Sequence, residues 1–355
     1  MALVFAVSIA DSLLRIPIQP SDSLEQILEA QRSPSTVASF WATISAPGYM
    51  RPVFRAQNKA LFDLAGGAHY RAVYRGFHVV LLVTALLLFA AAARVQTIRD
   101  VSSLAFALTV LVGLHTFRGT VQEAFPVNHY LNVLVVCLLT LNLARSKGAL
   151  WVDVLAIVGF TYAILLLETG VLVWVIAATA WMLGWRGISS RAVLTMTALL
   201  IGYFYLRFGY FDIGAPTMTE RSTGYLLDVL EPAELEEKFG RRPLWLYTYN
   251  VVTSAMSVVS SEPRSGSFVA VRSWLEGALL PRTLLAIVTS LATTIVIVTA
   301  AVVRARSHRQ LDDTARFLIL FLAVLAGNAA LSFAYSKDEI LIPAGAFYAL
   351  AVYAG

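Results

Sequence analysis

Long apolar stretches separated by short polar connections dominate the pattern of the chain. We interpret about ten of them as membrane-spanning helices, at residues 1–14, 78–93, 101–115, 130–144, 151–167, 171–185, 192–208, 283–303, 316–334 and 340–354. Because a perpendicular helix needs about 20 residues to cross a bilayer, the boundaries of the shorter stretches are expected to shift by several residues. The pattern predicts an all-α, polytopic membrane protein.

The basic residues of the short connections give the chain an orientation. They gather in four connections: Arg94 and Arg99; Arg145 and Lys147; Arg186 and Arg191; and Arg304, Arg306 and Arg309 with Arg316 at the edge. With the spans above, all four connections lie on one side, which the positive-inside rule assigns to the cytoplasm. The external segments are then 15–77, 116–129, 168–170, 209–282 and 335–339.

Composition supports this interpretation and excludes several kinds of site. Of the 355 residues, 58% are hydrophobic and 14% are charged, and the mean hydropathy is +0.71. A soluble domain has about 25% charged residues. The single cysteine, Cys137, allows no disulfide within the chain, and the sequence contains no HExxH, CxxC, Walker A or GxSxG motif. We expect one transmembrane domain over residues 1–355, without a soluble domain of independent size.

The stretch 46–62, APGYMRPVFRAQNKALF, places three cations ahead of a span. Pro52 suits the first position of a helix and biases Arg51 away from helical angles. At 100° per residue, Arg55 and Lys59 share one face, with Arg51 entering beside them. Val53, Ala56, Ala60 and Leu64 form the opposite, apolar face. This amphipathic helix suits the membrane interface, where the cations contact headgroups or Arg51 binds a phosphate with its planar fork.

Carboxylates of the external segments supply candidate chemistry. Asp22 and Glu25 share a helical face, where a carboxylate can act as a general base or bind a hard cation. The same pair resembles a capping box, which is the structural alternative. Glu168, in LLLETGVLV between two apolar runs, faces a cavity or belongs to a turn.

Two other external segments carry polar residues with weaker signals. His115 and His129 bracket the second external loop, which also holds Glu123, and their loose spacing is weak evidence for zinc. Tyr335 and Lys337 stand before the last span, in a charged turn or at the mouth of a site. In the loop 209–282, the stretch LYTYNVVTSAMSVV is expected to lie on the membrane surface or to re-enter it.

The order of these elements resembles the GT-C superfamily of membrane glycosyltransferases, especially its protein O-mannosyltransferase-like and TMTC-like branch. Members of that branch carry an acidic residue after the first span, a Y-R-P-L-like element, an interfacial helix and a histidine that opens the next span. The corresponding residues here are Asp22 in PSDSLEQI, Arg51 in YMRPV and His78 in YRGFHVVLL.

Three later segments extend the resemblance. HTFRGTVQEAF is similar to the family element H-P-x-x-x-E-x-V, with Glu123 matching better than His115. LLLETG is similar to the K-E segment, with Glu168 present and the lysine missing, and YSKDEILIPAGAFYAL resembles the late external loop. The paired acids that the family often has are separated here, since Ser23 and Leu24 stand between Asp22 and Glu25.

The resemblance implies transfer of a sugar from a polyprenyl-phosphate-linked donor to an acceptor on the external face of a bacterial inner membrane. It implies Asp22 as the general base, or Asp22 and Glu123 as ligands where a divalent metal ion is used. The residues implied to bind substrate or line the cavity are Arg51, Arg55, Lys59, Glu25, Glu123, His129, Glu168, Tyr335 and Lys337. Expected partners are the lipid donor, membrane lipids and membrane protein subunits, and no nucleic acid.

Two other functions are compatible with the sequence. A non-catalytic GT-C-like subunit of a larger complex is favoured by the short first span, the separated acids and the missing soluble domain. A transporter or flippase of an anionic lipid would need ionisable residues at mid-bilayer and broken helices. Because the charges cluster on one external face, we place it last.

Overall fold

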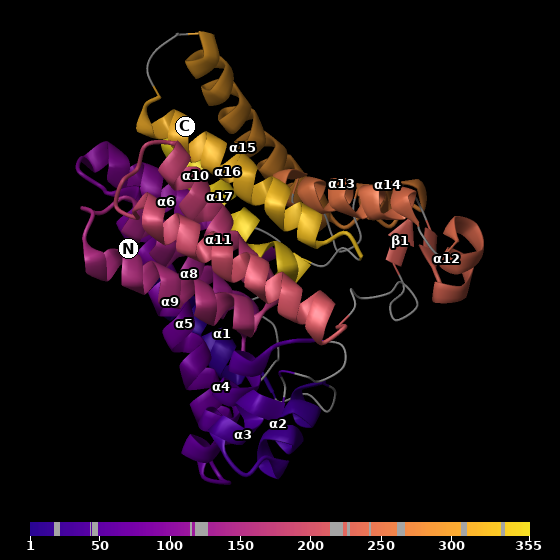
Figure 1. Cartoon of the computed structure of the whole chain (residues 1–355). Helices are drawn as coiled ribbons and strands as arrows, with labels where there is room; N and C mark the ends of the chain where they lie inside the picture. The colour runs from indigo at the N-terminus through magenta and orange to yellow at the C-terminus, as the bar shows by residue number, and fades with distance from the viewer. Residues whose placement is uncertain are drawn as a thin grey trace. The chain divides into compact units, whose positions relative to one another are not determined.

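The computed structural model of the chain is almost entirely helical (Figure 1). It describes residues 1–17, 22–42, 44, 49–113, 116–117, 127–213, 223–225, 228–240, 243–260, 267–306, 311–334 and 338–355. The α-helices are α1 (Ala2–Arg15), α2 (Asp22–Arg32), α3 (Thr36–Ala42), α4 (Pro52–Ala65), α5 (Tyr70–Ala93), α6 (Ile98–Gly113), α8 (His129–Ala144), α9 (Leu150–Leu166), α10 (Val171–Met182), α11 (Ser190–Phe204), α12 (Pro232–Phe239), α13 (Leu244–Ser260), α14 (Ser267–Leu275), α15 (Pro281–Arg306), α16 (Asp313–Leu331) and α17 (Ile342–Ala354). Shorter elements are the 3₁₀ turns η1 (Glu168–Gly170) and η4 (Asp338–Leu341), the π-helix η2 (Tyr205–Tyr210) and the strands β1 (Thr223–Tyr225) and β2 (Asp228–Leu230).

Each apolar stretch that we interpreted as a span overlaps one of these helices. In the described part of the chain, four helical segments are long and apolar enough to cross a membrane: Tyr70–Ala93, Ser190–Tyr210, Thr283–Arg304 and Asp313–Leu331. They suggest a membrane protein, in agreement with the sequence, while the number of about ten spans stays a prediction. The small antiparallel hairpin β1–β2 is the one departure from an all-α fold among the described elements.

The helices divide into two compact units, and we describe each by itself. The first unit comprises Met1–Val95 and Thr120–Ala215. At its centre lies α8, which packs against α5, α9 and α10 and is apolar all round, as expected for a helix buried on every side. The side chain of Asn128 caps this helix by accepting from the Leu131 N–H at 2.9 Å. The helices α2, α3 and α4 pack together, and α4 also packs against α5 and α9 (Figure 1).

The second unit comprises Gln96–Gly119 and Pro216–Gly355. Its centre is α17, which packs against α6, α15 and α16. Asn328 fixes the entry to α17, because its amide donates to the Ile340 carbonyl at 2.8 Å and accepts from the Ala344 N–H at 3.1 Å. The stretch expected at the membrane surface forms α13, which packs against α15 and α16 and buries Leu246 and Val258. The single domain expected from the sequence stays a prediction.

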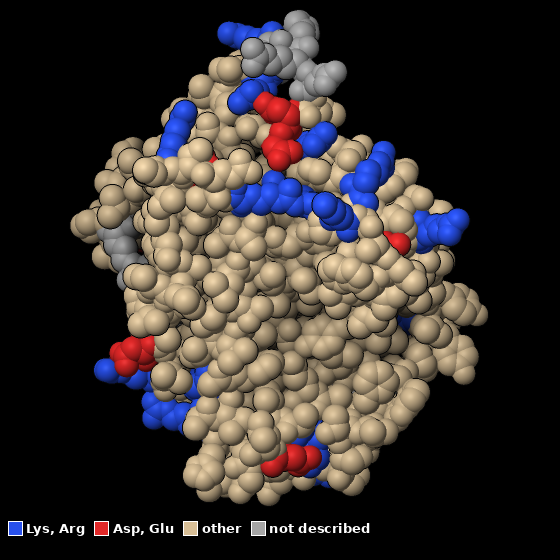
Figure 2. Space-filling model, turned by 90° about the vertical axis from the view of Figure 1, so that its left-hand side faces the viewer, with Lys and Arg blue, Asp and Glu red and all other residues tan. Residues whose placement is uncertain are grey.

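Charged side chains occupy only part of the surface. Figure 2 shows groups of Lys, Arg, Asp and Glu side chains on a surface that otherwise consists of other residues. Apolar side chains are exposed along α9, where Leu150, Trp151 and Val158 are at least half exposed. In water such surface is costly, whereas in lipid it is solvated, so the distribution suits a protein that lies in a membrane.

Candidate functional site

In the first unit, Glu168 lies in a tight reversal of the chain between α9 and α10. Helix α9 ends at Leu166, Leu167 is extended with φ −159° and ψ 148°, and η1 leads directly into α10. Gly170 permits this reversal, because a Cβ atom there would lie 2.2 Å from the carbonyl oxygen of Ala163. The carboxyl group of Glu168 is thereby placed at the junction of two helices.

We expect the substitution Gly170→Ala to destabilise the first unit by about 1–3 kcal/mol, since the added methyl group overlaps backbone rather than a flexible side chain. Cys137 is fully buried and is the only cysteine, so the temperature at which a thiol-reactive fluorophore labels it reports unfolding. Gly202→Ala is the matched control, because a Cβ atom at Gly202 meets nothing within 4 Å. An unchanged labelling temperature for Gly170→Ala would show that the reversal does not depend on the glycine.

Two arginine side chains converge on the Glu168 carboxylate. Arg51 donates from Nε at 3.0 Å and from Nη2 at 2.6 Å to Oε2 of Glu168. Arg207 donates from Nη1 at 3.0 Å to Oε1. The side chains of Arg51 and Glu168 are 23% and 24% exposed, and that of Arg207 is 4% exposed, so the cluster is largely shielded from solvent.

The local structure around Arg51 agrees with the sequence interpretation. Pro52 is the first residue of α4, and Arg51 caps the helix with φ −127°, outside the helical region. Its guanidinium also lies over the ring of Tyr49, with Cζ 4.2 Å from the centroid. Among the described residues, the acid that Arg51 contacts is Glu168, which lies 117 positions further along the chain.

Sequence reasoning did not find Arg207, which lies in the π-helix η2 at the end of α11. Its Nη1 also donates to the hydroxyl of Tyr203 at 2.9 Å, and its buried Nε has no hydrogen-bond partner among the described residues. Single π turns inside helices are frequent at functional sites. The available signal was an arginine at the end of an apolar run, where ionisable residues are costly and often functional.

Among the described residues, two guanidinium groups face one carboxylate in this cluster, an excess of one positive charge. Burial opposes ionisation of Glu168, but the Arg51 and Arg207 guanidinium groups outweigh it and hold the pKa of Glu168 below its ordinary value. Glu168 is therefore ionised at neutral pH. An anion with two or three oxygens could share or replace its hydrogen bonds, since guanidinium donors match carboxylate and phosphate oxygens alike.

A second polar network in the same unit joins three helices. Gln57 of α4 donates to the Tyr162 hydroxyl of α9 at 3.0 Å, and Asn132 of α8 donates to the same hydroxyl at 2.8 Å and to Gln57 Oε1 at 2.9 Å. Such a network holds α4 in position on α8 and α9. It thus fixes the helix that Arg51 caps.

The other cations of the 46–62 stretch have partners outside the cluster. Arg55 forms an ion pair with Glu29 of α2. Lys59 is buried, and its Nζ lies 2.7 Å from Asp63 Oδ1. The sequence places Lys59 on one face with Arg55, in contact with lipid headgroups, whereas packing within the unit buries its side chain.

The remaining candidate residues are not brought to the Glu168 cluster by any contact we describe. Asp22 begins α2 but its side chain is outside the described part, and Glu25 is exposed on the same helix. His129 is buried, with its ring 5.1 Å from that of Phe54. His115, Glu123, Tyr335 and Lys337 lie outside the described residues. His78, carried over from the family, is buried in α5 with Nε2 2.7 Å from Asn128 Nδ2.

Within the described ranges, no three His, Cys, Asp or Glu side chains converge as a metal site requires. Because Glu123 and the side chain of Asp22 lie outside those ranges, the metal ion stays a prediction. Compared with models of protein families, with curated proteins and with solved structures, the chain matches none.

Proposed function

We propose that this protein transfers a sugar from a polyprenyl-phosphate-linked donor to an acceptor at the external face of the membrane, as a GT-C-like enzyme with about ten spans. The observation that carries the proposal is the convergence of Arg51 and Arg207 on Glu168. A departing lipid phosphate needs a cationic, partly desolvated site at the end of membrane-spanning helices. In the described part of the chain this cluster combines two guanidinium groups with one carboxylate, is largely shielded, and lies at the end of α9 and α11.

In this proposal the phosphate of the carrier is bound by Arg51 and Arg207, and Glu168 keeps the two guanidinium groups in place when no carrier is bound. Positive charge at the phosphate lowers the free energy of the departing group. The acceptor hydroxyl is deprotonated by a carboxylate, for which Asp22 at the start of α2 is the candidate. The same proposal includes the use of a divalent metal ion in the sugar transfer.

Turnover tests the proposal. Protein in lipid nanodiscs is incubated with a polyprenyl-phosphate hexose carrying a labelled sugar, with cell-envelope extract as the source of acceptor. We expect label to leave the lipid fraction, and we expect Asp22→Asn to lower the rate by about 10²-fold or more, the usual contribution of a general base. Asp11→Asn, which makes the same change at an exposed position of α1, is the control. Full activity of Asp22→Asn would exclude Asp22 as the general base. Absence of turnover by the wild type would contradict the proposed transferase activity.

One observation favours a non-catalytic subunit instead. Arg51 already directs both Nε and Nη2 at Glu168, which is also the geometry of a purely structural ion pair. A subunit of this kind would co-purify with a stable membrane protein partner, and would not turn over the labelled donor. The turnover experiment therefore separates the two functions.

A further inference from the structure

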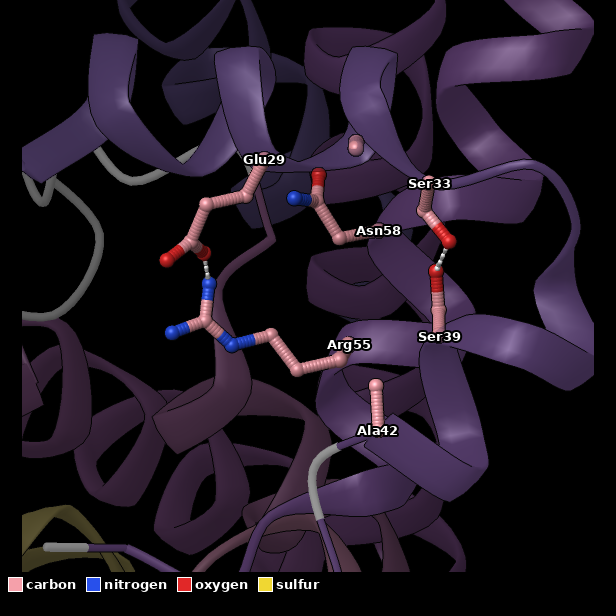
Figure 3. Close-up of a pocket in the computed structure, with 7 residues that line it drawn as sticks. Glu29, Ser33, Ser39, Ala42, Arg55 and Asn58 are labelled. Atoms are coloured by element: carbon pink, nitrogen blue, oxygen red, sulfur yellow. Dashed lines mark hydrogen bonds and ion pairs between the residues drawn. The ribbon is translucent and has the colours of Figure 1, made fainter. Parts of the chain in front are cut away.

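A cavity separate from the Glu168 cluster lies among α2, α3 and α4 (Figure 3). Its volume is about 240 Å³. The residues that line it are Glu29, Ala30, Ser33, Ser39, Ala42, Arg55 and Asn58. Pockets for drug-sized ligands measure roughly 300–1,000 Å³, so this cavity suits a smaller molecule.

The lining offers donors and acceptors in nearly equal number. Figure 3 shows Asn58 between the Glu29–Arg55 ion pair on one side and the Ser33–Ser39 pair on the other. The Ser39 hydroxyl lies 2.6 Å from that of Ser33. Because Glu29 and Arg55 neutralise each other, the cavity carries no net charge that would select an ion.

Asn58 is held rigidly and keeps unused capacity. Its Nδ2 donates to the Gln26 carbonyl at 2.7 Å, and its Oδ1 accepts from the Tyr74 hydroxyl at 3.0 Å. A side-chain amide has two N–H donors and two lone pairs, so one of each has no partner among the described residues. Asn58 is 1% exposed, and both of its polar side-chain atoms have one partner within the protein.

We infer that this cavity is a binding site for a small neutral polyhydroxylated ring, of the size of a monosaccharide. Each hydroxyl of such a ring both donates and accepts, so adjacent hydroxyls can donate to Glu29 and accept from Arg55 while another pairs with Asn58. Ala30 and Ala42 leave the room that the ring occupies. This site does not depend on the proposed transferase activity, since it shares no residue with the Glu168 cluster.

Saturation-transfer NMR on the protein in phosphatidylcholine nanodiscs tests the site with methyl α-D-glucopyranoside as the probe. We expect saturation of the probe by the wild type, and binding at least tenfold weaker for Glu29→Gln, which removes a charged hydrogen-bond acceptor. Ala42→Leu fills the cavity without altering a polar group and should also abolish binding. Gln31→Ala, exposed on the same helix and outside the lining, should bind as the wild type does. Labelling of Cys137 confirms that each variant is folded.

Three results would overturn the inference: no saturation of the probe by the wild type, undiminished binding by Ala42→Leu, or displacement of the probe by inorganic phosphate. A glucosyl-diacylglycerol added to the nanodiscs identifies the source of the ring. Displacement of the probe assigns the site to a glycolipid headgroup, and no displacement assigns it to a free saccharide; both support the site. If the turnover experiment shows no sugar transfer, the probe-binding results described here keep the same meaning.

Discussion

Replacing Glu168 with glutamine is expected to lower the free energy of unfolding by about 3 kcal/mol, the largest effect of any conservative substitution in the first unit. The carboxylate is the acceptor for Arg51 and for Arg207, which is 4% exposed. Glutamine retains the shape but leaves two positive charges close together in a shielded site. The thermal midpoint for labelling of Cys137 measures the loss.

The matched control is Glu276→Gln, directly after α14. Glu276 makes an ion pair with Arg272 at 2.8 Å, but both side chains are about half exposed, so its loss should cost less than 1 kcal/mol. Equal midpoints for Glu168→Gln and the wild type would mean that the cluster contributes nothing to the fold. A double variant with Arg207→Gln should recover part of the loss, because it removes one of the stranded charges.

The same carboxylate predicts a pH dependence. Since the folded-state pKa of Glu168 is depressed, its contribution is complete above the unfolded-state pKa of about 4.3 and is lost as pH falls through the lower folded-state value. The difference in midpoint between wild type and Glu168→Gln should therefore be constant near neutral pH and shrink below about pH 4. A difference that grows on acidification would contradict the assigned sign.

The second large effect concerns recognition of the lipid phosphate. Arg51→Lys retains the charge but removes the planar fork whose Nε and Nη2 both point at one oxygen. We expect polyprenyl phosphate to bind about tenfold more weakly, in line with one lost charged hydrogen bond. Native mass spectrometry of the protein released from nanodiscs, titrated with polyprenyl phosphate, measures the affinity.

Arg272→Lys makes the same change on an exposed helix and should leave the affinity unaltered. If Arg51→Lys binds the lipid as tightly as the wild type, the contribution of Arg51 is charge alone. If Arg51→Gln also binds normally, Arg51 has no part in binding the phosphate.

The backbone around Arg51 could be predicted because it depends on neighbours in sequence. Pro52 disfavours helical angles for Arg51 and begins α4, and both features are present. The apolar stretches likewise contain the helices expected of them, since the backbone hydrogen bonds of an apolar segment are satisfied within a helix. Local rules of this kind need no knowledge of the tertiary structure.

The partners of these residues could not be predicted. Arg51 and Glu168 are 117 positions apart, and Arg207 reaches the carboxylate through a π turn that no single-sequence period reveals. Lys59 illustrates the same limit, because the helical register places it on one face with Arg55 but does not show that its side chain is buried. Burial of a cation is decided by packing between elements, which the pattern of one helix does not contain.

A density map of the protein in nanodiscs containing polyprenyl phosphate tests the central proposal most directly. We expect the phosphate within hydrogen-bond distance of the Arg51 and Arg207 guanidinium groups, with the Glu168 carboxylate moved away from at least one of them and the lipid tail extending along the apolar helices. A map in which Glu168 keeps all three hydrogen bonds while the phosphate lies elsewhere, or is not bound, would contradict the proposal.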